Sequence, residues 1–268
     1  MTARELADAA GVSEAAVVRF AQALGFRGFP ELRAALRHEV LTRLGASAMV
    51  QGDGNAQNSA RLPQGLDVIR QGFELDRSLV EATARLNSPD AFAAVARELC
   101  AARRVWVTAH GTTFPAAHYL AMKLRQILGD AETLTVGVGD LADRTFAIGP
   151  EDVLIGISLM RYFRATLDIM RVGRERSATV VAITDSPSAP AARLAAMTLL
   201  VARDAAVSHF SEVGLSAAIN AILSCVTLES GPRARSVLAQ YDRMVRDWRV
   251  LADDPSPSSS PEGDADHS

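Results

Sequence analysis

The segment Asp152–Arg164, D-V-L-I-G-I-S-L-M-R-Y-F-R, joins an apolar run to hydroxyl and guanidinium groups. Its first part, Val153–Ile157, is rich in β-branched residues and follows the turn-forming pair Gly149-Pro150, which is typical of a buried strand in a parallel sheet. Ser158 ends this run, and a helical pattern begins near Phe163. Open α/β sheets bind ligands at such strand-to-helix joints, because the N-terminus of the helix offers free N–H groups. We therefore predict a ligand site in this segment.

The side chains of this joint favour a small anionic ligand. Arg161 and Arg164 can bind a carboxylate or phosphate through paired hydrogen bonds, and Ser158 adds a hydroxyl group. Thr112 and Thr113, which follow an earlier apolar run, can add two more hydroxyl groups. Apolar contacts would come from Met160, Tyr162 and Phe163. The alternative is that the two arginines cover the edge of the sheet or contact a partner subunit.

Three histidines and one glutamate carry weaker signals. His110 lies in the first joint and could contact a ligand, whereas His118 fits a helix face and His209 precedes a helix. Glu212 lies where that helix is predicted to begin, and a carboxylate there interacts favourably with the helix dipole. We predict no catalytic residue, no metal site and no cofactor.

The joint belongs to a series of alternating strand and helix patterns. Five apolar, β-branched runs are predicted to be strands: Val105–Thr108, Thr133–Val136, Val153–Ile157, Thr179–Ile183 and Thr198–Val201. Helical patterns between them predict an α/β fold, a five-stranded parallel sheet flanked by helices on both faces. Right-handed crossovers bring the carboxyl ends of the strands to one rim. Four joints are expected along this rim: His110–Phe114, Gly137–Leu141, Ser158–Arg164 and Thr184–Ala189.

Helices are also predicted on either side of the sheet. Residues 65–86 and a helix capped by Asn87–Asp90 precede the sheet, and their apolar stripes are expected in the core. The apolar helix Val213–Leu228 is predicted to be either core or a subunit interface, and another helix covers Pro232–Leu251. Together these elements define a ligand-binding domain over residues 65–251.

Two further segments have compositions that do not favour packed structure. Residues 45–64 are rich in Gly, Asn, Gln and Ser, and they are predicted to form a flexible linker. Residues 252–268 contain acidic side chains, Pro and Ser but no basic side chain, and they are predicted to form a disordered tail.

Residues 1–44 are predicted to form a small all-α module with two short helices. The run Thr2-Ala3-Arg4-Glu5 fits a capping box at the start of the first helix, and Gly11-Val12 breaks that helix. Ser13 is a natural N-cap for a second helix that runs to Leu24, with Gly25 after its end. Two helices joined by a short turn with glycine predict a helix-turn-helix. A plain helical hairpin with solvated arginines is the alternative.

In a helix-turn-helix the first turns of the second helix face the bases in the major groove. The residues predicted to face double-stranded DNA there are Ser13, Glu14, Ala16 and Arg19. Arg19 could contact a guanine edge or a phosphate, and Arg27 and Arg33 suit phosphates.

Composition restricts the class of protein. The chain has 268 residues, is 49% hydrophobic and carries a formal net charge of −3, so a DNA-binding surface must be local. No apolar run reaches the about 18 residues of a membrane helix, and no membrane partner is expected. Its two cysteines have no metal-binding spacing and are expected to be reduced thiols of a cytoplasmic protein.

Residues 7–36, A-D-A-A-G-V-S-E-A-A-V-V-R-F-A-Q-A-L-G-F-R-G-F-P-E-L-R-A-A-L, resemble the RpiR family of bacterial transcriptional regulators. That family places a helix-turn-helix domain before a sugar isomerase (SIS) domain. The resemblance therefore implies DNA binding. Family members usually carry further helices before the position of Met1, so the module is expected to be partial.

Residues 90–230 are similar to the SIS domain, whose phosphosugar site is usually made by two loops. The first loop has the pattern G-x-G-x-S, which is A-H-G-T-T here, so that Gly111 and Thr113 match. The second has S-x-S-G-x-T, of which only Ser158 is present, and Arg161 replaces the glycine. The run I-T-D-S-P, which contains Asp185, resembles a regulator subgroup that also replaces the second loop.

This comparison implies a ligand different from the usual phosphosugar of the family. The ligand-binding residues that we predict are His110, Gly111, Thr112, Thr113, Ser158, Arg161, Tyr162, Arg164 and Asp185. In SIS isomerases a carboxylate or histidine near Glu212 can act as a base, which leaves a catalytic role for Glu212 as an alternative.

The main hypothesis is a transcriptional regulator whose SIS domain senses a small anionic metabolite, such as a phosphosugar, and alters operator binding. The alternatives are an SIS-type sugar-phosphate isomerase and a sugar-phosphate binding protein that does not bind DNA. SIS domains resemble one another in forming oligomers, and a two-fold symmetric operator requires a dimer. A homodimer or homotetramer is therefore expected.

Overall fold

A computed structural model of the chain describes residues 2–33, 35–36, 66–137, 139–204 and 210–248. The predicted linker at residues 45–64, the predicted tail at residues 252–268 and His209 lie outside the described residues.

Five parallel strands form one sheet in the order β2-β1-β3-β4-β5, which confirms the predicted fold class. The strands are β1 (Val105–Thr108), β2 (Ala131–Leu134), β3 (Val153–Ser158), β4 (Thr179–Thr184) and β5 (Met197–Leu200). The strand β2 begins two residues earlier than the apolar pattern predicts. Its register explains this difference, because Val105 lies opposite Ala131 and Thr108 lies opposite Leu134. Val136 lies beyond the end of the ladder and is half exposed.

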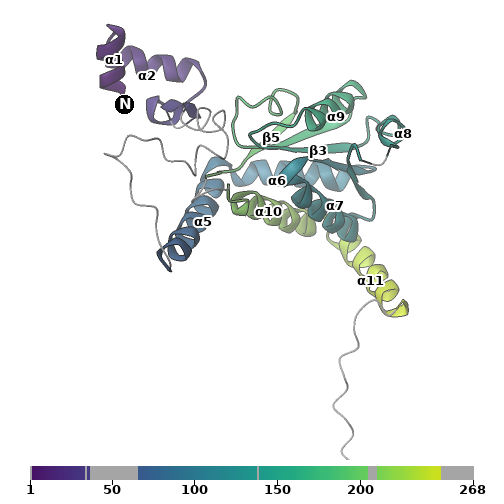
Figure 1. Cartoon of the computed structure of the whole chain (residues 1–268). Helices are drawn as coiled ribbons and strands as arrows, with labels where there is room; N and C mark the ends of the chain where they lie inside the picture. The colour runs from purple at the N-terminus through teal and green to yellow at the C-terminus, as the bar shows by residue number, and fades with distance from the viewer. Residues whose placement is uncertain (1, 34, 37–65, 138, 205–209, 249–268) are drawn as a thin grey trace, which may run out of the picture.

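Helices cover both faces of the sheet (Figure 1). Their bounds are α5 (Leu66–Leu86), α6 (Pro89–Ala101), α7 (Phe114–Leu128), α8 (Leu141–Phe146), α9 (Arg164–Glu175), α10 (Val213–Ser230) and α11 (Pro232–Asp247), with a 3-10 turn η1 (Gly111–Thr113). The helix α9 packs on one face, and α6, α7 and α10 pack on the other. The strand β4 serves both layers, because Val181 and Ile183 face one core and Val180 and Ala182 face the other.

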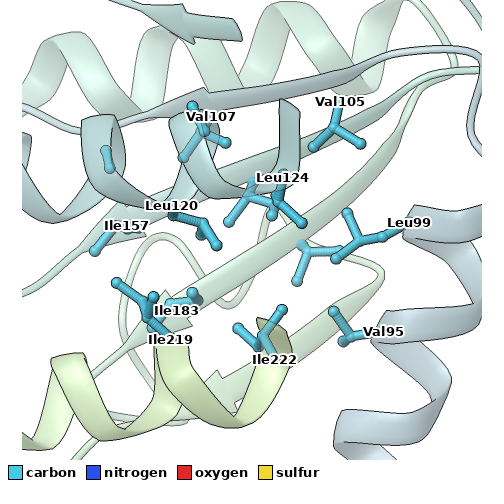
Figure 2. Close-up of a cluster of buried hydrophobic side chains, with 14 of the residues drawn as sticks. Val95, Leu99, Val105, Val107, Leu120, Leu124, Ile157, Ile183, Ile219 and Ile222 are labelled. Carbon is cyan, nitrogen blue, oxygen red and sulfur yellow. The ribbon is translucent and has the colours of Figure 1, made fainter. Parts of the chain in front are cut away.

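The larger core lies between the sheet and the layer of α6, α7 and α10. Figure 2 shows its aliphatic side chains interleaved from strands and helices. The labelled members are Val95, Leu99, Val105, Val107, Leu120, Leu124, Ile157, Ile183, Ile219 and Ile222. Burial of such a cluster holds β1 and β3 side by side, and the pocket described below depends on that arrangement.

The helix α10 is a core helix. Leu215, Ala218, Ile219 and Ile222 are buried along one side, whereas the other side carries exposed polar residues such as Asn220. By length and composition alone, α10 is also long and apolar enough to cross a membrane, with a mean hydropathy of 1.5 over its 18 residues. The expectation from the sequence concerned continuous apolar runs, whereas this helix meets the criterion through its mean hydropathy. Its polar residues interrupt every continuous apolar run, although the mean hydropathy stays high.

The helix α5 packs on α10 through a narrow face. Leu79 and Thr83 are buried there, whereas Ile69, Phe73 and Val80 are exposed. The expectation that the whole apolar stripe of this helix lies in the core is therefore wrong for those three residues. Only one side of α5 meets the described part of the domain, and the stripe is wider than that contact.

An ion pair fixes the amino end of β3, at the start of the segment Asp152–Arg164 and away from the pocket. The Asp152 carboxylate is fully buried and accepts hydrogen bonds from both Arg103 Nε (2.9 Å) and Arg103 Nη2 (2.7 Å). It also accepts from Trp106 Nε1 (3.1 Å) and the Gly149 N–H (3.0 Å). A buried carboxylate requires such partners. Asp152 therefore has a structural role at the end of β3 far from the rim.

The N-terminal residues form the predicted pair of helices, α1 (Ala3–Ala10) and α2 (Glu14–Ala23). The capping box is present, because Thr2 accepts from the Glu5 N–H and the Glu5 carboxylate accepts from the Thr2 N–H. Gly11 has a φ of 66° and ends α1 in the left-handed conformation that glycine adopts most readily. The Ser13 hydroxyl accepts from the Ala16 N–H and begins α2. Ala7, Val17, Ala21, Phe29 and Leu32 form a small buried cluster.

Candidate ligand-binding site

A small pocket lies at the carboxyl ends of β1 and β3, which are adjacent parallel strands. In the strand order β2-β1-β3-β4-β5, the chain leaves β1 in one direction and reaches β3 in the other. Loops diverge at such a switch point, and open α/β sheets bind ligands in the crevice between them. The topology therefore places the loop after β1 and the loop after β3 around one site.

The lining comes from three places in the chain. It consists of His110, Thr112, Thr113, Ile157, Ser158, Leu159, Met160, Arg161, Phe163, Thr166 and Arg203. Five of the predicted ligand residues are in this lining, namely His110, Thr112, Thr113, Ser158 and Arg161.

His110 precedes η1, and its ring is buried with only one of its two nitrogens hydrogen-bonded to a described residue. Its Nδ1 lies 2.9 Å from Thr166 Oγ1 at the start of α9, whereas Nε2 has no hydrogen-bond partner among the described residues. Burial lowers the pKa of His110 from its usual value of 6.5, so the neutral ring is favoured. When the Thr166 hydroxyl donates to Nδ1, the ring proton lies on Nε2 and can be donated to a ligand.

Ser158 ends β3 and offers a second unpaired group. Its hydroxyl oxygen is buried and has no partner in the part of the chain that the structure describes. Its backbone carbonyl accepts a hydrogen bond from Thr184 Oγ1 (2.7 Å), which fixes the strand end against β4. A buried hydroxyl group without a partner is costly, and a ligand oxygen at this point would satisfy it.

Arg203 is the charged side chain of the pocket that the sequence analysis missed. It follows β5, its side chain is 8% exposed, and its guanidinium carbon lies 4.4 Å from the centre of the Phe210 ring. Its Nη1 donates to the Met160 carbonyl, and its Nη2 donates to Glu212 Oε1 at 3.2 Å. Its Nε has no partner among the described residues. An arginine two residues after a predicted strand was a usable signal, but the fifth strand was not included in the predicted rim.

Glu212 lies at the start of α10, as predicted, and its carboxylate also has a partner that the sequence did not indicate. It occupies the N-cap position of α10, yet its side chain makes no capping hydrogen bond. Its carboxylate instead pairs with Arg203, and Oε2 has no partner in the described residues. The pair partly neutralises the buried guanidinium and leaves one unpaired donor and one unpaired acceptor near the pocket.

The remaining predicted ligand residues lie around the pocket. The Asp185 carboxylate accepts from the Met160 N–H (2.9 Å) and from the Tyr162 hydroxyl (3.0 Å), so both residues shape the loop after β3. The Arg164 side chain is 93% exposed and lies 3.8 Å from the Asp168 carboxylate, outside the pocket lining. His118 is also outside the lining; it is exposed and stacks on Phe114.

Gly111 lies close to the Phe163 ring and is not part of the pocket lining. Its φ is 68°, and a Cβ atom there would lie 2.3 Å from Phe163 Cζ. Glycine is therefore required both for the backbone conformation and for the close approach of the ring. This contact brings the loops after β1 and β3 together beside the pocket, whose lining includes both Phe163 and the exposed Arg161.

The predicted DNA-facing side chains lie on α2 and after it. Ser13, Glu14, Arg19, Arg27 and Arg33 are exposed, and Ala16 is half-buried. Arg27 is near Glu31, with 3.6 Å between Arg27 Nε and Glu31 Oε2. The Ser13 hydroxyl is occupied by its cap, so Arg19 is the exposed basic side chain on α2 itself.

Comparisons with known proteins agree with this division of the chain. The family profile "Helix-turn-helix domain, rpiR family" matches residues 1–43, and the profile "SIS domain" matches residues 98–228. The HTH-type transcriptional regulator YfhH of Escherichia coli (strain K12) is 29% identical over 217 residues, which are 79% of this chain and 73% of YfhH.

Two solved structures are similar to this chain, one over the SIS domain and the other over most of the chain. The sugar isomerase domain of the RpiR transcription factor from Sphaerobacter thermophilus is 31% identical, with a TM-score of 0.62, covering 65% of this chain and 98% of that domain. The Vibrio vulnificus NanR protein, solved in complex with ManNAc-6P, is 18% identical, with a TM-score of 0.61, covering 92% of this chain and 86% of NanR. The second likeness concerns the fold alone.

A helix-turn-helix followed by an SIS fold defines a class of DNA-binding transcriptional regulators. The chain belongs to the RpiR family of that class. The resemblance drawn from residues 7–36 and from the loops after β1 and β3 is thereby confirmed.

Proposed function

We propose that this regulator senses a small anionic metabolite, such as a sugar phosphate, in the pocket at the ends of β1 and β3. The observation that carries the proposal is the set of unpaired polar atoms that come from three segments of the chain, His110 Nε2, Ser158 Oγ and Arg203 Nε. Two of these can donate to an anion in any state, and His110 can do so in the tautomer described above. The N-terminus of α9 adjoins the pocket, and no side chain caps it.

The dimensions of the pocket favour the acidic group of the ligand as its occupant. The enclosed part is small, and Phe163, which lies close to Gly111, is part of its lining. The rest of a sugar phosphate would extend toward the exposed Arg161 and Thr112. This orientation keeps an ionised group against buried donors, where a hydrogen bond is stronger than in water.

The proposed role is sensing without catalysis. Glu212, the carboxylate considered as a base, accepts no capping hydrogen bond from α10 and is paired with Arg203. An isomerase remains the second candidate, because His110 lines the pocket, has an unpartnered Nε2 among the described residues, and has a pKa that burial lowers. Turnover assays with hexose and pentose phosphates decide between them. Turnover that is lost in both His110→Gln and Glu212→Gln would establish the isomerase.

Ligand binding is tested by calorimetry on the full chain. The probes are inorganic phosphate, N-acetylmannosamine 6-phosphate and glucose 6-phosphate, each sugar compared with its unphosphorylated form. Ser158→Ala and Arg203→Lys should weaken binding of a phosphorylated probe by about 10- to 100-fold, because each removes a hydrogen bond to a charged group. Arg164→Ala is the matched control, an arginine of the same joint outside the lining, and should bind as wild type does. Equal affinities in all variants would contradict the site.

We further propose that Arg19 reads a base or phosphate, that Arg27 and Arg33 contact phosphates, and that the regulator acts as a homo-oligomer on a two-fold operator. A regulator that binds chromosomal DNA works in the cytoplasm, where we place it. Light scattering coupled to gel filtration measures the oligomer directly, and a monomer at the concentration that saturates DNA would contradict the proposal.

A further inference from the structure

The segment that carries Arg203 also contacts α5 on its other side. Ala202, one residue before Arg203, donates its backbone N–H to Thr83 Oγ1 at 3.0 Å. Further along the segment, the Ser211 hydroxyl donates to Asp76 Oδ1 at 2.5 Å. One stretch of chain between β5 and α10 therefore contacts the pocket through Arg203 and α5 through two hydrogen bonds.

These contacts are tightly packed. Thr83 is 2% exposed, and a Cβ atom on Gly214 would lie 2.8 Å from Thr83 Oγ1 and 2.4 Å from the Ala202 carbonyl oxygen. A segment packed this closely cannot move without displacing its neighbour, because interiors lack the free volume to absorb a shift. Movement at Ala202 is therefore passed on to Thr83.

The end of α5 is also fastened to the sheet. Asn87, just after α5, donates from Nδ2 to the Leu200 carbonyl (2.7 Å), and its Oδ1 accepts from the Leu200 N–H (2.8 Å). Asn87 Nδ2 also donates to the Thr83 carbonyl (2.9 Å). The carboxyl end of α5 is thus fixed at β5, and a displacement at Thr83 or Asp76 would tilt the part of α5 nearer its amino end. In sequence, that end leads through residues 37–65 to the helix-turn-helix.

We infer that residues Ala202 and Arg203 couple the pocket to α5, with Thr83 and Asp76 as the positioning residues that receive the change. The inference rests on the proposed function, because Arg203 is taken to bind the ligand. An anion that engages Arg203 Nε redistributes the guanidinium between that ligand, the Met160 carbonyl and Glu212. Any difference in these contacts shifts Ala202, and α5 follows. Coupling of this kind typically changes the affinity at the second site by roughly 5- to 150-fold.

The test is hydrogen–deuterium exchange of the α5 peptide in the full chain, with inorganic phosphate and N-acetylmannosamine 6-phosphate as probes. In wild type, a bound probe should change exchange in α5. Thr83→Val has the same shape but cannot accept from Ala202, so the response should be lost while probe affinity is retained. Thr83→Ser keeps the hydroxyl group, and α5 exchange in this variant should respond to the probe as in wild type. Ser78→Ala is the control, because the exposed Ser78 hydroxyl bonds only to Leu75 within α5.

A second arm needs no ligand. Arg203→Lys, without any probe, should raise exchange in α5 relative to wild type, since the contacts to Met160 and Glu212 are weakened. Exchange in β3 and β4 measures whether each variant is folded. If Arg203→Lys does not fold, Glu212→Gln replaces it, because Glu212→Gln also weakens the contact between Arg203 and Glu212. Unchanged α5 exchange in a folded variant would overturn the coupling.

The two arms separate the inference from the proposed function. A probe that binds wild type without changing α5 overturns the coupling and leaves the ligand site intact. Failure of both probes to bind counts against the proposed function, and the Arg203→Lys result then decides the coupling alone.

Discussion

At the scale of single residues, the site depends on polar groups that burial holds in one state. His110 is the clearest case, because one ring nitrogen is occupied by Thr166 and burial disfavours the charged ring. Ser158 is held at the end of β3 by the hydrogen bond from Thr184 Oγ1 to its backbone carbonyl, and its buried hydroxyl lines the pocket. Arg203 Nη1 and Nη2 donate to the Met160 carbonyl and to Glu212, whereas Nε has no partner among the described residues. Each group is preorganised, which reduces the entropy that a ligand must overcome.

The lowered pKa of His110 predicts a pH dependence of stability. Between the lower pKa of the folded state and the usual value of 6.5, the unfolded chain binds more protons than the folded chain. The contribution of His110 to the free energy of unfolding is therefore fully present above pH 6.5. It is lost as the pH falls from 6.5 through the folded-state value.

Urea unfolding of wild type and His110→Gln over a pH series measures this difference. The stability of wild type relative to the variant should be constant above pH 6.5 and should fall below it. His118→Gln, which removes an exposed histidine, should follow wild type with a constant offset. Parallel curves for wild type and His110→Gln would show that burial does not perturb this ring.

At the scale of elements, the packing of α10 against α5 limits how far the segment after β5 can move. Gly214 begins the part of α10 that meets both Thr83 and the Ala202 carbonyl, and no room exists there for a methyl group. Gly72 in α5 has the opposite surroundings, with nothing within 4 Å of the position of a Cβ atom.

Alanine at these two helical glycines should therefore have opposite effects on stability. Gly214→Ala overpacks a contact whose nearest neighbour is a backbone oxygen and should destabilise by about 1–3 kcal/mol. Gly72→Ala should stabilise by about 0.5–1 kcal/mol, because alanine has the higher helix propensity. Thermal and urea unfolding give both values. A neutral Gly214→Ala would mean that α5 and α10 are more loosely joined than the structure has them.

The elements also explain what sequence reasoning could and could not predict. The β-branched runs locate all five strands to within two residues, because buried strands of a parallel sheet have a local apolar signature, and Thr2, Gly11 and Ser13 mark the helix ends. The shift of β2 follows from its register with β1, which is not a local property. Arg203 was missed because its burial depends on Met160, Phe210 and Glu212, which are brought together only by the strand order.

At the scale of the whole molecule, the regulator must read DNA with a chain whose net charge is −3. Attraction to DNA must therefore come from a local surface, and Arg19, Arg27 and Arg33 are exposed in the module that supplies it. Arg19 lies on α2, the helix that corresponds to the recognition helix of a helix-turn-helix. Binding through these side chains should weaken steeply as salt concentration rises.

Fluorescence anisotropy with a duplex from upstream of the regulator's own gene, and with an unrelated duplex, separates two roles of Arg19. Arg19→Ala should cost about 1–3 kcal/mol on the specific duplex if Arg19 contacts a base edge, with a smaller effect on the unrelated one. If it contacts a phosphate, both affinities should fall alike, and the salt slope should decrease by about 1.

Arg85→Ala is the matched control for this experiment. Arg85 is an exposed arginine at the end of α5, paired with Glu81, and lies outside the predicted DNA-facing set. Its removal lowers the net charge by the same amount as Arg19→Ala but should leave the affinity and the salt slope within error of wild type. Equal losses in both variants would mean that overall charge, and not the position of Arg19 on α2, determines DNA binding.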